Sequence, residues 1–258
     1  MALTDETAET YEEFLSDIKI VLLEVMREEM LTFEVEDGVI VNSSNNISNM
    51  ARLRRRLTAV VGEVQFEFED RLEADLALIV ADTVEGLPEL PKEPDPTVFD
   101  RISEILENNM FEVAGVLASM MLVPRSTSSG AVISQQTTTQ TLKNTERKLE
   151  VKLERAKNAT EAAIYSAQRA TTVEVVSDAA PAWVYYYEGP FDSRIRKFCY
   201  KYAKKAYSKE ALERLAADPD RKGQPLPVFA HLGGYRCRHL LAPMPIETAR
   251  ERGYRVIL

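Results

Sequence analysis

Residues 48–84 read SNMARLRRRLTAVVGEVQFEFEDRLEADLALIVADTV, and this stretch sets the expected fold class. Apolar residues recur in it at every third or fourth position, from Met50 through Leu57 and Val64 to Ile79. That spacing places them along one side of an α-helix, and no proline interrupts the run. We therefore predict a long amphipathic helix that packs against other helices, and a mainly α-helical chain.

Three further segments favour helices, at residues 4–26, 97–122 and 142–172. The last is highly charged, and its narrow apolar line fades into alanines, so we expect a connecting helix that is a strut or spacer rather than a buried core helix. Whether it pairs as a coiled coil or packs on other helices stays open. Between the helices, residues 86–96 hold four prolines and indicate a stiff connector. Residues 124–141 are rich in Ser, Thr and Gln, which is typical of a polar linker or arm.

A short β-hairpin is expected at residues 33–41, where two β-prone runs flank Asp37-Gly38, a pair that suits a type I′ turn. The expected organisation is a helical body with this hairpin (1–123), a polar arm (124–141), a connecting helix (142–172) and a small α+β C-terminal module (173–258). For the module the sequence predicts short strands at 173–176, 183–187 and 226–229, a helix from a cap at Asp192 to about Tyr207, and a helix over 209–217 capped by Ser208.

Charge is distributed unevenly along the chain. Residues 1–180 hold 17 Lys+Arg and 33 Asp+Glu, a net charge of -16, whereas residues 181–258 hold 15 and 8, a net charge of +7. The basic end could contact phosphate or an acidic protein, or the two surfaces could simply complement each other. Arg52 and Arg54–Arg56 form a second basic cluster, which we expect to pair with Glu63, Glu67, Glu69 and Asp70 rather than to bind phosphate.

Composition excludes several classes of function. Two histidines in 258 residues exclude a histidine-rich catalytic site, and two cysteines are too few for a disulfide framework. The acidic N-terminal segment does not resemble a signal peptide, and no stretch has the length and apolarity of a membrane helix. We therefore expect no membrane partner and a cytoplasmic site of synthesis.

All the cysteines and histidines lie near the C-terminus: Cys199, His231, Cys237 and His239. Two thiolates and two imidazoles suit a tetrahedral structural zinc site. Against this, Cys237 and His239 are only two residues apart, and Cys199 falls on the apolar face of its helix. Buried packing cysteines with a hydrogen-bonded histidine, or a Cys199–Cys237 disulfide, stay open as alternatives.

The acidic and basic residues of the same region allow more than one reading. Asp192 precedes Arg194 and Arg196, and Arg238 follows Cys237. We expect Asp–Arg pairing inside a compact module, with phosphate contact as the main alternative. A catalytic Asp192–His239 pair is conceivable, but the sequence offers no general base beside a nucleophile, so we expect no enzyme.

Two segments in this region, GPFDSRIRKFC (189–199) and GGYRCRH (233–239), together resemble the C-terminal region of phage head-morphogenesis proteins related to the phage Mu F-like minor head family. The matching residues are Gly189, Pro190, Asp192, Arg194, Arg196 and Cys199, then Gly233, Gly234, Tyr235, Cys237, Arg238 and His239. QPLPV (224–228) lies between them, close to the family's middle element, whereas His231 departs from the pattern. The resemblance covers about 60 of the 258 residues, and the first 180 carry no recognised motif.

The resemblance implies a bacteriophage virion structural protein, a minor head or portal-associated component that acts in head assembly by protein–protein binding. Its expected partners are the portal or major capsid protein and copies of itself, and the basic module could contact packaged DNA. The expected location is the virion, and the host cytoplasm during assembly. The alternatives are a nuclease- or transferase-like module acting on nucleic acid, or an internal DNA-contacting head protein.

Overall fold

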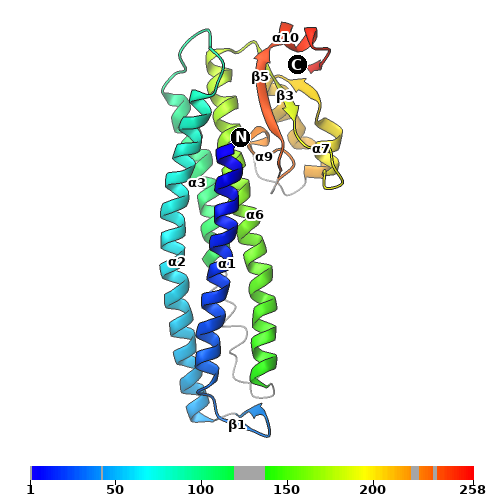
Figure 1. Cartoon of the computed structure of the whole chain (residues 1–258). Coiled ribbons are helices and arrows are strands. Elements are labelled where there is room, and N and C mark those ends of the chain that lie inside the picture. Colours follow the sequence, from blue (N-terminus) through cyan, green and yellow to red (C-terminus); the bar gives the residue numbers. More distant parts are fainter. Residues whose placement is uncertain (1, 42, 119–136, 222–226, 235–236) are drawn as a thin grey trace. The chain divides into compact units, whose positions relative to one another are not determined.

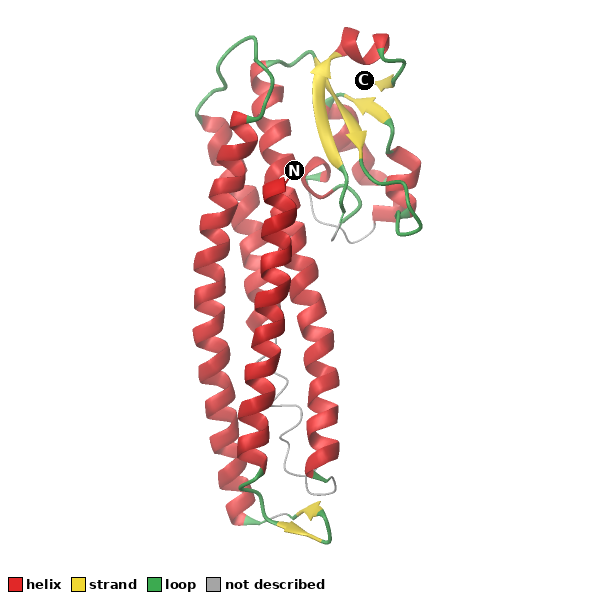
Figure 2. Ribbon diagram, in the orientation of Figure 1, coloured by secondary structure: helices red, strands yellow, loops and turns green. Residues whose placement is uncertain are grey.

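The computed structural model describes residues 2–41, 43–118, 137–221, 227–234 and 237–258. Four long helices and a small C-terminal sheet dominate these ranges (Figures 1 and 2). The helices are α1 (Ala2–Met30), α2 (Ser44–Glu85), α3 (Thr97–Ala118) and α6 (Thr138–Ala179). The predicted mainly α fold with a small α+β C-terminal module is therefore confirmed. None of the helices in the described ranges is both long enough and apolar enough to cross a membrane.

Contacts divide the chain into two compact units, and the long helices run through both. We call residues 9–72 and 111–158 the bundle unit. The module unit consists of residues 1–8, 73–110 and 159–258. The predicted arm falls mostly on residues 124–136, outside the described residues, and the end of the third predicted helix, 119–122, does so too. Residues 138–141, assigned to the arm from sequence, belong to α6.

The bundle unit buries the apolar stripes that the sequence predicted. Tyr11 of α1 and Phe68 of α2 meet edge to face with ring centroids 4.9 Å apart. On α6, Leu149, Leu153 and Ala156 are buried. The prediction of a spacer rather than a buried core helix is therefore wrong for this part of α6, because small alanine side chains let neighbouring helices approach closely.

An ion-pair cluster joins α1 and α2 within the bundle unit. Buried Glu29 accepts hydrogen bonds from Arg52 Nε at 2.7 Å and Arg56 Nη1 at 2.8 Å. Arg56 also contacts Glu28 at 3.0 Å. For Arg52 and Arg56 the predicted pairing with acids is confirmed, but their partners are on α1 rather than among the acids of residues 63–70.

The predicted hairpin is present as β1 (Val35–Glu36) and β2 (Val39–Ile40), which pair antiparallel. Asp37 and Gly38 both have positive φ, 50° and 79°, as a type I′ turn requires. The side chain of Asn46 holds the hairpin in place. Its Oδ1 accepts a hydrogen bond from the N–H of Glu34, and its Nδ2 donates to the carbonyl oxygens of Glu34 and Val41.

The module unit contains a four-stranded sheet in the order β5-β3-β4-β6. Strand β3 pairs antiparallel with β4 and β5, and β4 pairs parallel with β6. The elements are β3 (Trp183–Glu188), α7 (Lys197–Tyr202), β4 (Lys205–Tyr207), α8 (Lys209–Arg214), α9 (Val228–His231), β5 (Leu240–Pro245), α10 (Ile246–Glu251) and β6 (Arg255–Ile257). Short 3₁₀ turns follow α8 at Leu215–Ala217 and Pro219–Arg221.

Side chains cover both faces of this sheet. Tyr185 and Tyr187 of β3 point into the main core with Val173 and Val176 of α6. Residues of α7, α8 and α9 complete that core, among them Phe198, Leu212 and Phe229. Val184 faces the opposite side, where Met244 and Ala249 form a smaller cluster. The alternation along β3 follows from the period of two in a strand.

The predicted strand at 173–176 is wrong, since these residues lie inside α6. Their β-branched side chains disfavour a helix only slightly, and Val173, Val175 and Val176 are all buried, so packing outweighs the local preference. The stretch 226–229 was also predicted wrongly as a strand: Leu226 lies outside the described residues, and Val228–His231 form the short helix α9.

The predicted helix from Asp192 to Tyr207 is much shorter in the structure. Arg238 binds the carboxylate of Asp192, and α7 begins only after Arg196, without a side-chain cap. The chain then turns at Lys204 and enters β4, because pairing with β3 satisfies the backbone there. Strand β3 and the Ser208 cap of α8, which accepts from the N–H of Ala211, are as predicted.

Candidate metal centre

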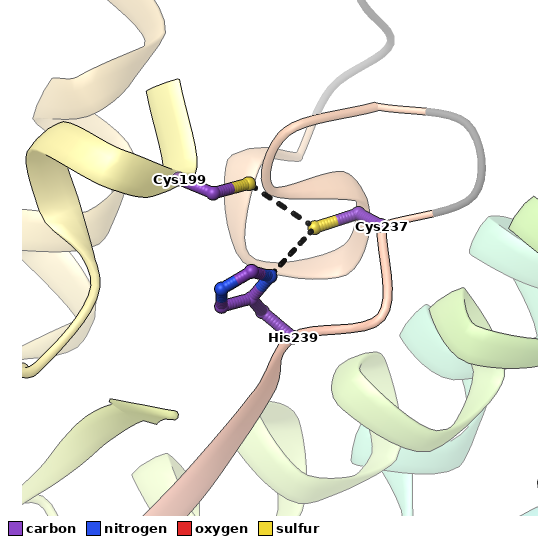
Figure 3. A group of neighbouring side chains, drawn as sticks. All are labelled: Cys199, Cys237 and His239. Atoms are coloured by element: carbon purple, nitrogen blue, oxygen red, sulfur yellow. Dashed lines mark hydrogen bonds between the residues drawn. The ribbon is translucent and has the colours of Figure 1, made fainter. Parts of the chain in front are cut away.

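Three of the four predicted ligands gather in one buried group (Figure 3). Cys199 comes from α7, and Cys237 and His239 come from the segment that leads into β5. The Sγ atoms of Cys199 and Cys237 are 3.5 Å apart, and Cys237 Sγ lies 3.9 Å from His239 Nδ1. One ligand atom from each residue lies within 4.8 Å of the other two, so the group could hold a metal ion.

The spacing and the chemistry of the group fit Zn²⁺. Bonds of about 2.3 Å to sulfur and 2.0 Å to nitrogen in a tetrahedron place neighbouring ligand atoms roughly 3.5–3.8 Å apart. The Cys199–Cys237 and Cys237–His239 distances lie close to this range, and the Cys199–His239 pair lies within 4.8 Å. Two sulfurs with one imidazole also form a soft donor set that selects zinc over magnesium or calcium.

The fourth predicted ligand, His231, is not part of this group. It lies on α9, buried, and burial together with the charges of Arg169 and Arg221 lowers its pKa to about 3. The four-ligand site predicted from sequence is thus corrected to three side chains. His231 is the last residue of α9, whereas Cys237 and His239 lie in the segment that leads into β5.

Two glycines make room for the group. A Cβ on Gly233 would lie 2.4 Å from Cys199 Sγ, and a Cβ on Gly189 would lie 2.7 Å from the ring of His239. Gly189 also has a φ of 152°, which L side chains rarely adopt. Any larger residue at either position would push a candidate ligand out of place.

Arg169 of α6 holds the segment that carries Cys237 and His239. Its fully buried guanidinium donates to the carbonyl oxygens of Ala230 at 2.7 Å, Cys237 at 2.9 Å and His239 at 3.1 Å. Burial lowers the pKa of Arg169, and negative charge on Cys237 opposes that shift. A buried cation beside two thiols therefore favours the thiolate form that a metal needs.

The two cysteines differ in how readily they lose a proton. The hydrogen bond with Cys199 lowers the pKa of Cys237 well below its usual value, against the effect of burial, and His239 and Arg169 lower it further. The same hydrogen bond and burial raise the pKa of Cys199. Both shifts thus arise mainly from the one hydrogen bond that links the two sulfur atoms, in which either thiol could be the donor.

Tyr187 lies behind the group. Its hydroxyl donates to Cys199 Sγ at 3.2 Å, and its ring meets the His239 ring edge to face with centroids 5.3 Å apart. Burial raises the pKa of Tyr187, so the hydroxyl keeps its proton and remains a donor. Such outer contacts orient metal ligands in known sites.

The predicted Asp–Arg pairing is confirmed. Arg238 Nη2 donates to both carboxylate oxygens of Asp192, at 2.8 and 3.1 Å. The N–H of Arg194 binds the same carboxylate at 2.9 Å, while the Arg194 guanidinium is 3.7 Å away. The hydrogen bond from Arg238 is the main reason why the pKa of Asp192 is lowered.

The remaining motif residues also have places near the group. Arg196 donates to the carbonyl of Gly233, and Gly234, with a φ of 88°, turns the chain by bonding His231 O through its N–H. Pro190 lies between β3 and α7. Tyr235 lies outside the described residues.

Sequence reasoning missed Arg169, Tyr187 and the close approach of Gly233. An arginine within the alanine line of α6, between Ala167 and Ala170, was a usable signal, since a charged residue on a buried helix face needs buried partners. Tyr187 gave no such signal.

Comparison with protein-family models found no match, and comparisons with curated proteins and with solved structures found none either.

Proposed function

We propose that this chain is a structural protein of a tailed-phage head, a minor head or portal-associated component that acts in assembly by binding other proteins. One observation carries the proposal: the two sequence elements of the resemblance interlock residue by residue. The contacts are Gly189 with His239, Asp192 with Arg238, Arg196 with Gly233, and Cys199 with Cys237. Two sequence elements about 40 residues apart thus contact each other in the fold, as expected if both belong to one shared module.

The contacts of the candidate reactive side chains agree with a protein that binds its partners without catalysing a reaction. The carboxylate of Asp192 is engaged by Arg238 and by a backbone N–H. Cys199, Cys237 and His239 are buried, so a substrate would have no direct approach to them. The catalytic Asp192–His239 pair considered from sequence is therefore not favoured.

The helices offer the surface that an assembly protein needs. Helices α2 and α6 each have 42 residues, which corresponds to roughly 63 Å at 1.5 Å per residue. Large apolar side chains stand exposed on the described helices, among them Phe66 and Phe111. Where such side chains gather into one patch, the patch marks a surface that another protein covers.

We further propose that Cys199, Cys237 and His239 hold a structural Zn²⁺. The ion would link α7 to the segment before β5 and would neutralise the thiolates beside Arg169. These residues supply three of the four ligands that a tetrahedral zinc site takes. Burial of all three residues supports a structural role rather than a catalytic one.

The test of the assembly function is to locate the chain in particles. In a phage that carries a nonsense mutation in this gene, we expect few infectious particles and rescue by the wild-type chain supplied in trans. Mass spectrometry of purified proheads and virions should find the chain at a fixed ratio to the portal protein. Full infectivity of the mutant, with the chain absent from wild-type particles, would refute the proposal.

A parallel assay separates the enzyme alternative. The purified full chain should not cleave DNA or RNA with Mg²⁺, Mn²⁺ or Zn²⁺. Cleavage that Asp192→Asn abolishes and Asp220→Asn preserves would establish the nuclease alternative, since Asp220 is an exposed carboxylate of the same unit.

A further inference from the structure

We propose that the module unit binds single-stranded nucleic acid through the outward side of α7 and through residues that flank this helix. We call this surface the aromatic-basic face; it consists of Phe191, Lys197, Tyr200, Lys201 and Lys204, all exposed. The inference goes beyond the assembly function and does not depend on it.

The aromatic rings of this face are unusual within the module unit. Other large rings of this unit, such as Tyr185, Tyr187 and Phe198, are buried, and Trp183 and Tyr254 are partly buried. Tyr200 is instead 64% exposed and Phe191 43% exposed, and their ring centroids lie 5.0 Å apart at an interplanar angle of 35°. Exposed neighbouring rings on a basic surface are a platform on which unpaired bases stack.

Helical spacing brings the cations beside the rings. Lys197, Tyr200 and Lys201 are separated by three and four positions, so they share the outward side of α7, whereas Phe198 and Cys199 face the core. Lys201 forms an ion pair with Asp218, whose side chain is almost completely buried. Lys197 and Lys204 therefore supply most of the charge that this face offers to a phosphate backbone.

The backbone fixes Lys204 against the rings. Lys204 has a φ of 63°, in the left-handed region that side chains other than glycine seldom adopt. Its N–H donates to Tyr187 O at 2.7 Å, and its Nζ lies 4.3 Å from the centre of the Phe191 ring. Strained positions of this kind gather where a side chain must be held for binding.

Charge complementarity decides the partner class. The segment 181–258 carries a net charge of +7. A nucleic acid that binds such a surface releases its counterions, which favours binding. Its bases can also stack on the two exposed rings, whereas an acidic peptide has no bases to stack. The structure therefore favours a nucleic-acid strand over an acidic protein.

The test is fluorescence anisotropy with the full chain, a labelled oligothymidylate of about 20 nucleotides and a duplex of the same length. We expect tighter binding to the single strand. The variant F191A/Y200A should weaken single-strand binding by roughly 5- to 150-fold per stacked ring and leave duplex binding nearly unchanged. The matched control is F111A, which removes a ring that is 82% exposed on α3.

A second variant tests the cations. K197Q/K204Q should weaken binding to both ligands and reduce the slope of log affinity against log salt by about 1.4 for the single strand, or 0.7 for each phosphate contact. The control variant K143Q/K148Q also removes two positive charges, but on α6, and it should leave the slope unchanged. Circular dichroism melting of each variant should match the wild type, since the substituted side chains are exposed.

Three results would overturn the inference: no binding at about 50 mM salt, binding that does not depend on salt, or equal loss in F191A/Y200A and F111A. The wild type could fail to bind either oligonucleotide while the F191A/Y200A variant is absent from particles that contain the wild type. This pair of results would instead make the aromatic-basic face a contact with another protein. Particle location and oligonucleotide binding are separate measurements, so failure of one proposal leaves the other standing.

Discussion

Arg169 shows how one side chain can support a whole site. Its three hydrogen bonds reach carbonyl groups of the segment that holds two candidate ligands, and none of these carbonyls belongs to its own helix. A buried guanidinium in this position stabilises the segment because it satisfies acceptors that water cannot reach.

Substitution of Arg169 by methionine should therefore destabilise the module unit by about 3 kcal/mol or more, because three buried carbonyls lose their donor. Urea unfolding followed by tyrosine and tryptophan fluorescence would measure the change. Arg250→Met, an exposed arginine on α10, serves as control and should change stability by less than about 0.5 kcal/mol. Equal effects from the two variants would contradict the role given to Arg169.

The metal proposal makes a prediction about stoichiometry. Protein purified under reducing conditions should contain one zinc per chain by elemental analysis, and Cys237→Ser should contain almost none. Replacement by Co²⁺ should give thiolate-to-cobalt absorption in the wild type, because two sulfurs bind the ion. His231→Gln is the control, since His231 lies outside the group, and it should keep the zinc. A metal-free wild type would end the proposal.

At the scale of elements, the junction of α1 and α2 depends on one buried acid. Burial raises the pKa of Glu29, but the hydrogen bonds from Arg56 and Arg52 outweigh it, so the pKa is lowered from 4.5. A carboxyl group with a lowered pKa stabilises the folded state above its unfolded pKa and loses that contribution as the pH falls.

Stability of the bundle unit should therefore decrease as the pH falls below about 4.5, because protonated Glu29 no longer attracts the two arginines. Glu29→Gln should be less stable than the wild type at pH 7, and the difference should shrink toward low pH. Thermal melting across this range would check both expectations. Glu63→Gln, on the exposed part of α2, is the matched control; if its pH profile changed as much, Glu29 would have no special role.

At the scale of the whole molecule, the division into two units crosses the long helices. Helix α6 supplies Leu149 and Leu153 to the core of the bundle unit, and Val173 and Val176 to the core of the module unit. Each unit thus has a core of its own, and the candidate metal centre belongs only to the module unit.

Removal of metal should consequently affect the two units differently. With a strong chelator, hydrogen exchange should quicken in β3, β5 and α7, because the link between Cys199 and the segment before β5 is lost. Exchange in residues 9–30 of α1 should stay the same. Mass spectrometry of exchanged peptides would show this, and a uniform increase along the chain would mean that the metal does not act locally.

How much of this could be read from the sequence differs between the helices and the site. Helix α2, the Asp37–Gly38 turn and the Ser208 cap were predictable, because periodicity, positive φ and capping act within a few residues. The strand predicted at 173–176 failed for the opposite reason: burial in a helix outweighed a weak local preference.

The sequence by itself determined the mainly helical fold, the basic C-terminal end and the residue types available for a metal site. Only the tertiary structure decided which of those residues meet: Cys199 joins Cys237 and His239, whereas His231 does not. It also brought Arg169 beneath them and Gly233 against Cys199. These contacts join residues far apart in the chain, and their energies come from packing and buried hydrogen bonds, which no local pattern of residues encodes.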